Sequence, residues 1–280
     1  MPFSNCLMKA VNSLTPFNTL TWLTGRIANA QGGPFTQFLI RSFIKVFDID
    51  MTDVAQQDLS AYKTFNEFFI RKLRPESRPI SQECTAIVPV DGTVGACGQL
   101  RAGRLIQAKG VDYSFKALMG GNIADCAPFE MGQFATLYLS PANYHRVHMP
   151  IDGTLVKTIH IPGKHFPVGR RNTSKLHNLY TLNERLVCLF GTREGPFCLI
   201  FVGAALVGSI HTSWGGTVVR RRGIEVKYYD PDQFTYKKGD EIGWFEYGST
   251  VICLWPDNTG ALTDKIIQGS PVKYGEPMTI

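Results

Sequence analysis

Short runs of apolar residues, separated by turn residues, fill the chain from about residue 84 to its C-terminus. The runs are rich in β-branched and aromatic residues, and glycine, proline, aspartate and asparagine stand between them. Strands at such close spacing, with turn signals between them, predict a mainly antiparallel β sandwich or a barrel-like core. The runs include TAIVPVDGTVGACG, FATLYLS, TLVKTIHIPG, RLVCLFG, FCLIFVGAALVG and STVICLW.

The segment before these runs has a helical pattern. Apolar residues recur at helical spacing in PFTQFLIRSFIKVF, residues 34–47, and its leading proline suits a first helical turn. Later, TFNEFF begins with Thr64 as a helix cap and has Glu67 three residues on. We therefore predict an α+β chain, with N-terminal helices over residues 1–75 followed by a β-rich region over residues 76–280.

Basic and aromatic side chains occur together in the N-terminal helices, and the whole chain has a net charge of +6. A positive excess favours anionic partners, such as an acidic membrane surface, phosphate groups or nucleic acid, without choosing among them. A helix with this composition can lie on a membrane surface. Its amphipathic face suits packing against the rest of the protein equally well. The basic residues concerned are Lys9, Arg26, Arg41 and Lys45.

Composition excludes several classes of protein. A hydrophobic content of 44% with a charged content of 19% is typical of a folded globular chain, not of a disordered or fibrous one. The seven cysteines include no C-x-x-C pair, and several stand inside apolar runs, which indicates buried free thiols in a reducing compartment. No apolar stretch reaches the roughly 18 residues of a spanning helix, and the start lacks the pattern of a signal peptide.

Two short motifs carry polar residues that chemistry could use. In VDGTV, residues 90–94, an Asp-Gly pair between apolar runs is a hairpin signal. In SPANYHRVHMP, His145 and His148 are three residues apart. They would share a side on a helical turn and diverge in a strand. No carboxylate or third histidine stands near them in the sequence, so we expect no metal site. Either histidine could carry protons or be purely structural.

A third motif is the Gly248-Ser249-Thr250 sequence in WFEYGSTVICLW. Read alone, it predicts a turn that leads into a strand. Glycine before serine also permits backbone conformations that other residues resist. In a strained peptide, the serine hydroxyl could attack the carbonyl before it if a base accepted the proton, and a histidine oriented by an aspartate is such a base. The same residue types would suit a serine hydrolase, although no G-x-S-x-G elbow surrounds this serine.

Taken together, the motifs resemble those of the phosphatidylserine decarboxylase family. The resemblance runs from about residue 60 to the C-terminus, with a weaker match in the N-terminal helices. The blocks that carry it, in the same order as in the family, are TFNEFFIRKLRPESRPI, PVDGTVGACG, IQAKGVDYSF, YLSPANYHRVHMPIDG, VGSIHTSWGGTV and KKGDEIGWFEYGSTVICLW.

The resemblance implies a proenzyme that cleaves itself between Gly248 and Ser249, with Tyr247 in place of the family's usual leucine. It implies a large chain of residues 1–248 and a small chain of residues 249–280. Ser249 becomes a covalent pyruvoyl group, whose carbonyl would take the substrate amine as a Schiff base and act as an electron sink. The reaction implied is decarboxylation of phosphatidylserine to phosphatidylethanolamine, a step of phospholipid biosynthesis.

The resemblance also implies roles for individual residues. Asp91, His148 and Ser249 would form the self-cleavage triad, and His145 would handle substrate or protons during decarboxylation. It implies a bacterial-type enzyme that is peripheral to the cell membrane on its cytoplasmic side and is often a homodimer. No nucleic acid is expected as a partner.

Two other interpretations compete with this one. A hydrolase would keep Ser249 as a lasting nucleophile in one intact chain. A carrier module is suggested by the hairpin-like sequences VDGTV and KKGDEIGWF, which look like those of lipoyl or biotinyl domains. Such domains present a lysine at an exposed hairpin tip, and no such lysine motif is found here.

Overall fold

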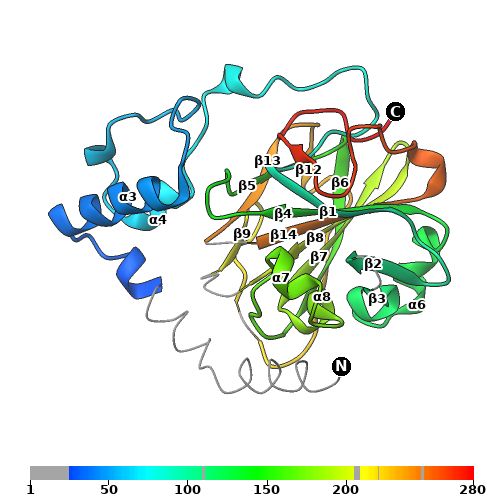
Figure 1. Ribbon diagram of the computed structural model, residues 1–280. Coiled ribbons are helices and arrows are strands. Elements are labelled where there is room, and N and C mark those ends of the chain that lie inside the picture. The colour runs from blue at the N-terminus through cyan, green and yellow to red at the C-terminus, as the bar shows by residue number, and fades with distance from the viewer. Residues whose placement is uncertain (1–24, 109–110, 205–208, 220, 247–248) are drawn as a thin grey trace.

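The computed structural model describes residues 25–108, 111–204, 209–219, 221–246 and 249–280. The N-terminal helices lie to one side of a body made of sheets, and an extended segment joins the two (Figure 1). The α-helices are α3 (Pro34–Phe47), α4 (Phe65–Phe69), α5 (Phe115–Leu118), α6 (Ile123–Cys126), α7 (Arg170–Thr173) and α8 (Leu179–Leu182). Single 3-10 turns occur at Leu59–Ala61, Pro75–Ser77, Ala127–Phe129 and Asp257–Thr259.

The two helices whose starts the sequence indicates, at Pro34 and after Thr64, are present. Residues 1–24 of the predicted helical region lie outside the described residues. Helix α3 begins at Pro34 and ends before Asp48, whose left-handed backbone turns the next N–H, that of Ile49, to the Ile44 carbonyl at 3.0 Å. Helix α4 is capped by Thr64, whose side chain accepts a hydrogen bond from the Glu67 N–H at 3.1 Å. None of the described helices is long and apolar enough to cross a membrane.

Within the described residues, the strands form a nine-stranded sheet, a four-stranded sheet and a separate hairpin. The large sheet has the order β11 (Glu225–Tyr228), β6 (Gly153–Ile161), β7 (Arg185–Thr192), β8 (Gly195–Val202), β14 (Ser249–Trp255), β4 (Gln133–Leu139), β1 (Gly92–Gln99) and β15 (Pro271–Val272), and β12 (Thr235–Tyr236) also pairs with β6. The small sheet has the order β10 (Gly216–Thr217), β9 (Ile210–Thr212), β13 (Glu241–Phe245) and β5 (Arg146–His148). The hairpin joins β2 (Arg104–Ala108) and β3 (Val111–Ser114).

All the strand pairings in these sheets are antiparallel, which confirms the predicted α+β class with a mainly antiparallel core. The core consists of open sheets and not of a closed barrel. One face of the large sheet shares a core with the small sheet, as Val251 of β14 and Val147 of β5 illustrate. The opposite face is covered by the hairpin and the short helices, with Ile252 of β14 and Tyr113 of β3 in its core.

The centre of the large sheet brings three distant segments to one end. Thr93 of β1 pairs with Tyr138 of β4, and Leu139 of β4 pairs with Ser249 of β14. In antiparallel strands the end of one lies beside the start of the next, so the residue before β1 and the first residue of β14 both lie beside the end of β4. That residue before β1 is Asp91, which places two predicted triad members at the same end of the sheet.

The expected hairpin at Asp91-Gly92 is not present. Gly92 is the first residue of β1, which pairs with the distant strands β4 and β15. A Cβ atom at Gly92 would lie 2.5 Å from the Tyr138 carbonyl oxygen, so glycine is required there by a close approach of two backbones and not by a turn.

The cysteines of the described part of the chain are all free, as predicted, and all except Cys97 are buried. Cys6 lies outside the described residues. The boundary at residue 75 between a helical, membrane-associating region and a catalytic region is not tested by the fold and stays a prediction.

Candidate active site

Ser249 is the first residue of β14 and is completely buried. Its hydroxyl has no hydrogen-bond partner among the described residues. A buried hydroxyl without a partner is unfavourable by about 1–3 kcal/mol, and such groups concentrate where a protein uses them for chemistry. Tyr247 and Gly248, and with them the other side of the predicted cleavage bond, lie outside the described residues.

The segment that carries both histidines leaves β4 beside Ser249. It begins with a turn in which Ser140 donates through its N–H and its hydroxyl to the Asn143 side-chain oxygen, at 2.8 and 2.7 Å. The buried Arg71 guanidinium then donates to the Ala142 carbonyl at 2.8 Å and fixes the turn from the side of α4. The turn is closed by a hydrogen bond from the Asn143 N–H to the Ser140 carbonyl at 3.0 Å, and the segment then leads into β5.

His145 lies fully buried with its ring stacked on Phe69, at 4.1 Å between ring centroids. Neither ring nitrogen has a hydrogen-bond partner in the described structure. Burial is the main cause that lowers the pKa of His145 to about 3; the Arg71 cation acts in the same direction, and the carbonyls of Pro141 and Ser140 oppose the shift. The imidazole is therefore neutral near pH 7 in the free protein. Ser140 follows Leu139, the register partner of Ser249, so His145 lies at the Ser249 end of the sheet.

His148, at the end of β5, has both ring nitrogens engaged. Its Nδ1 lies 2.8 Å from the Gly239 carbonyl oxygen and its Nε2 lies 2.9 Å from the Tyr144 hydroxyl. A carbonyl oxygen can only accept a hydrogen bond, so Nδ1 carries the proton. Nε2 then has no proton, and its lone pair accepts the hydrogen bond from the Tyr144 hydroxyl. Burial lowers the pKa of His148, although the Gly239 hydrogen bond and the Glu241 carboxylate oppose the shift. The two histidines therefore diverge, as expected for a strand.

Asp91 is buried at the start of β1 and is saturated with hydrogen bonds. Arg78 donates to it through Nη2 at 2.7 Å and through Nε at 3.1 Å, and the Tyr274 N–H donates at 2.8 Å. Arg78 also contacts Asp53 at 2.7 Å. Asp91 and His148 both belong to the described residues, and no direct hydrogen bond joins them. The Tyr274 ring instead stacks on His148, at 3.7 Å between centroids.

The sequence motifs therefore indicate the polar residues at this end of the sheet but not the residues that hold them in place. Tyr144 stands inside the YHRVHMP block and could have been noticed there. Arg78 stands in the block TFNEFFIRKLRPESRPI, where nothing marked it as a partner of Asp91. Tyr274 lies outside the blocks, and the pairing of β1 with β15 brings it to Asp91. The described structure contains no direct hydrogen bond among Asp91, His148 and Ser249. Their action as a triad therefore stays a prediction.

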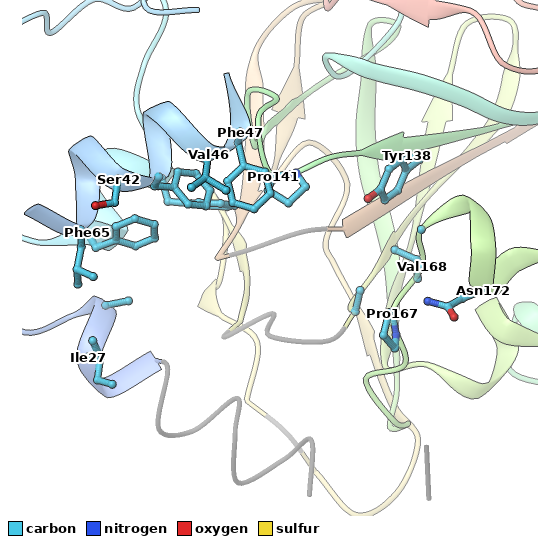
Figure 2. Close-up of a pocket in the computed structure, with 16 residues that line it drawn as sticks. Ile27, Ser42, Val46, Phe47, Phe65, Tyr138, Pro141, Pro167, Val168 and Asn172 are labelled. Atoms are coloured by element: carbon cyan, nitrogen blue, oxygen red, sulfur yellow. The ribbon is translucent and has the colours of Figure 1, made fainter. Parts of the chain in front are cut away.

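An apolar cavity of about 620 Å³ borders the site. Figure 2 shows Val46, Phe47 and Phe65 on its helical side, with Tyr138 and Val168 across from them. Phe69, which stacks on His145, and Pro141, which lies in the turn after β4, also line it. The cavity therefore lies between α3 and the turn after β4, and it meets the site at Phe69. Its remaining lining residues are Ile27, Ala28, Leu39, Ser42, Phe43, Pro167, Gly169, Asn172 and Ala204.

The sequence is also similar to known proteins. A family model described as phosphatidylserine decarboxylase matches residues 65–279, and one described as PSD matches residues 10–48. The chain is 43% identical to a phosphatidylserine decarboxylase proenzyme of Shewanella frigidimarina, with 96% of each chain covered. It is 42% identical to the protein of that name from Herminiimonas arsenicoxydans, with 98% of this chain and 94% of the relative covered. Matches of this extent show that the chain belongs to the phosphatidylserine decarboxylase family.

Proposed function

We propose that this chain is a proenzyme that converts its own Ser249 into a pyruvoyl group and then decarboxylates phosphatidylserine to phosphatidylethanolamine. The observation that carries the proposal is the buried Ser249 hydroxyl, which has no partner among the described residues. Ser249 stands at the start of β14, and the neighbouring strand β4 leads into the segment that carries both histidines. A serine that only completed a strand would be expected to satisfy its hydroxyl. A residue that is to become a covalent carbonyl group fits this position, and the near-full-length relatives named as proenzymes support that fate.

In the proposed self-cleavage, the Ser249 hydroxyl loses its proton and attacks the Gly248 carbonyl carbon. The peptide C–N bond breaks as the ester C–O bond forms. Elimination then breaks the bond between the serine Cβ and the ester oxygen, which leaves a carboxylate on Gly248 and a dehydroalanine at position 249. Addition of water and loss of ammonia give the pyruvoyl group. The chain ends at residue 248, and a second chain of residues 249–280 begins there.

His148 is the proposed base because its tautomer leaves Nε2 without a proton, so this nitrogen can accept one. The Tyr144 hydroxyl occupies that nitrogen at 2.9 Å. A proton from Ser249 therefore reaches His148 either through the Tyr144 hydroxyl or after that hydrogen bond has opened. Asp91 favours the protonated imidazole through its negative charge.

The pyruvoyl group, once formed, supplies an electron sink for the loss of CO2 from an amino acid. His145 is the proposed proton donor to the carbon that CO2 leaves. In the free protein its low pKa keeps it neutral. The phosphate and carboxylate of the substrate bring negative charge next to it, which raises its pKa and favours the protonated form. Substrate binding would thereby charge the acid that the second step needs.

The cavity and helix α3 suit a lipid substrate. The cavity is lined mainly by apolar side chains, and one of them, Phe69, stacks on His145. Acyl chains can therefore lie in the cavity while the head group reaches the polar residues. Helix α3 exposes Phe38 by 64% and Val46 by 74%, and Arg41 and Lys45 stand on the same helix. An apolar face with basic residues binds the surface of an anionic membrane.

The proposal also includes the finer features that the family resemblance implies. These are peripheral attachment at the cytoplasmic side of the membrane and assembly as a homodimer. After cleavage, the chain that begins at Ser249 would stay in place because β14 pairs along its length with β4 and β8.

Release of CO2 from phosphatidylserine in detergent micelles tests the function. The purified chain should release CO2 and form phosphatidylethanolamine, and Ser249→Ala should remain uncut and inactive. His148→Ala should block cleavage, whereas His145→Ala should cleave and then decarboxylate slowly. Phosphatidylserine turnover by an uncut chain, together with labelling of Ser249 by a phosphonate, would instead establish a hydrolase.

A further inference from the structure

We propose that Tyr274 is a positioning residue that connects Asp91 to His148 and holds the imidazole ready to act as the base in self-cleavage. The inference rests on the proposed function. It assigns a role to a residue that lies on the C-terminal side of the cleavage site and outside every motif identified in the sequence.

Strand pairing places Tyr274 against Asp91. Val272 of β15 pairs with Gly92 of β1, so the residues after β15 run beside the residues before β1. The Tyr274 N–H donates to the Asp91 carboxylate at 2.8 Å. Because Arg78 fills the remaining acceptor positions of this carboxylate, Asp91 is held between a cation and the Tyr274 backbone. Asp91 therefore bonds Tyr274 directly, whereas no hydrogen bond between described residues joins it to His148.

The Tyr274 side chain carries this connection to His148 in two ways. Its ring stacks on the imidazole with a centroid distance of 3.7 Å and an interplanar angle of 16°. Its hydroxyl donates to the Gly239 carbonyl at 2.8 Å, the same oxygen that receives the His148 Nδ1 proton. The Gly239 carbonyl therefore holds the Tyr274 side chain in place and also fixes the tautomer of His148. Gly239 adopts a φ of +96°, so this carbonyl depends on a backbone conformation that favours glycine.

The surroundings of His148 explain why the stacked ring matters. The imidazole is buried, with only 7% of its surface exposed, and Tyr274 is half-buried above it. Removing the ring would admit water to one face of the imidazole, favour its protonated form and free it to rotate away from the Gly239 carbonyl. The charged and titratable groups around it are Tyr144 on the preceding loop, Arg146 on β5, Glu241 on β13, Asp91 before β1 and Tyr274 itself.

Two substitutions separate the ring from the hydroxyl. Tyr274→Phe keeps the stacking and loses the hydrogen bond to Gly239, and Tyr274→Leu loses both. The matched control is Tyr228→Leu, at a tyrosine that is 73% exposed on the edge strand β11. The first readout is the pH dependence of self-cleavage after cell-free synthesis. The second is the titration of His148, followed by NMR of its imidazole in the uncleavable Ser249→Ala chain.

We expect Tyr274→Leu to raise the midpoint of the His148 titration and to slow cleavage at acidic pH by roughly tenfold, with recovery at alkaline pH. Tyr274→Phe should keep the wild-type midpoint and cleave within about threefold of the wild-type rate. Tyr228→Leu should change neither readout. A loss of rate that is equal at every pH, with an unchanged midpoint, would overturn the positioning role.

The two proposals fail in different ways. If the wild-type chain does not cleave, the proposed function fails. The NMR titration of the Ser249→Ala chain then still decides whether Tyr274 holds the His148 imidazole. If the wild type cleaves and Tyr274→Leu titrates and cleaves like it, the inference about Tyr274 fails alone. If Tyr274→Leu lacks a cooperative thermal transition, Tyr274→Met, which fills the same space without a ring, decides by the same two readouts.

Discussion

His145 should make the folded protein sensitive to acid, by an amount that follows from its burial. Its pKa is lowered from the ordinary value of 6.5 to about 3 in the folded chain. Between these two values the unfolded chain binds a proton at this histidine and the folded chain does not. Stability therefore rises with pH across this window, and it is lost progressively as the pH falls below 6.5.

The size of the effect follows from the same two values. One pKa unit corresponds to about 1.4 kcal/mol, so lowering the pH from 7 to 5 should cost about 2 kcal/mol of unfolding free energy through His145 alone. The variant His145→Gln cannot titrate in this range. Its buried amide changes the stability by the same amount at both pH values, so that offset cancels when the two are compared.

The assay is urea unfolding at pH 7 and pH 5 of the uncleavable Ser249→Ala chain, with and without His145→Gln. The unfolding free energy of the His145→Gln chain should fall by about 2 kcal/mol less than that of its parent. His177→Gln, at an exposed histidine, should keep the pH dependence of the parent. Equal losses in the His145→Gln chain and its parent would refute the claim that this histidine is held neutral by burial.

Two further substitutions test the backbone at the site and the lipid-facing helix. Gly92→Ala should destabilise the fold by more than about 1 kcal/mol and slow cleavage, because its Cβ would lie 2.5 Å from the Tyr138 carbonyl oxygen. The control is Gly95→Ala, where the nearest atom to the added Cβ is 3.5 Å away. It should have a much smaller effect in the same urea unfolding and cleavage assays. Val46→Asp should weaken sedimentation with vesicles of phosphatidylserine and phosphatidylcholine several-fold, because it puts a charge on the apolar face beside the cavity. Val156→Asp, at a half-exposed valine of β6, should bind these vesicles like the wild type, and equal weakening by both would argue against α3 as the membrane contact.

The sequence predicted those parts of the structure that depend on local chemistry. The cap at Thr64 and the start of α3 at Pro34 follow from short-range preferences, and both are present. The apolar runs likewise predicted strands such as β4 and β14. A short apolar run and the turn residues that bound it are local features, so a few neighbouring residues suffice to indicate a strand. The start of β14 at Ser249 was expected for the same reason.

Other features depend on contacts between residues far apart in the chain. The Asp91-Gly92 pair has the local signature of a hairpin, yet tertiary pairing with β4 and β15 draws it into a strand. The spacing of His145 and His148 left two geometries open, and only the pairing of β5 with β13 selected the divergent one. Tyr274 lies more than a hundred residues from His148, so no pattern along the chain could have linked them.

The intact mass of the purified wild-type chain, measured together with that of Ser249→Ala, decides whether the chain cleaves itself at Ser249. We expect two fragments for the wild type, residues 1–248 and residues 249–280, and the smaller one should carry a blocked pyruvoyl end in place of serine. The Ser249→Ala chain should give one mass for all 280 residues. A single uncut wild-type chain with an unmodified serine, in a sample that decarboxylates phosphatidylserine, would contradict the account.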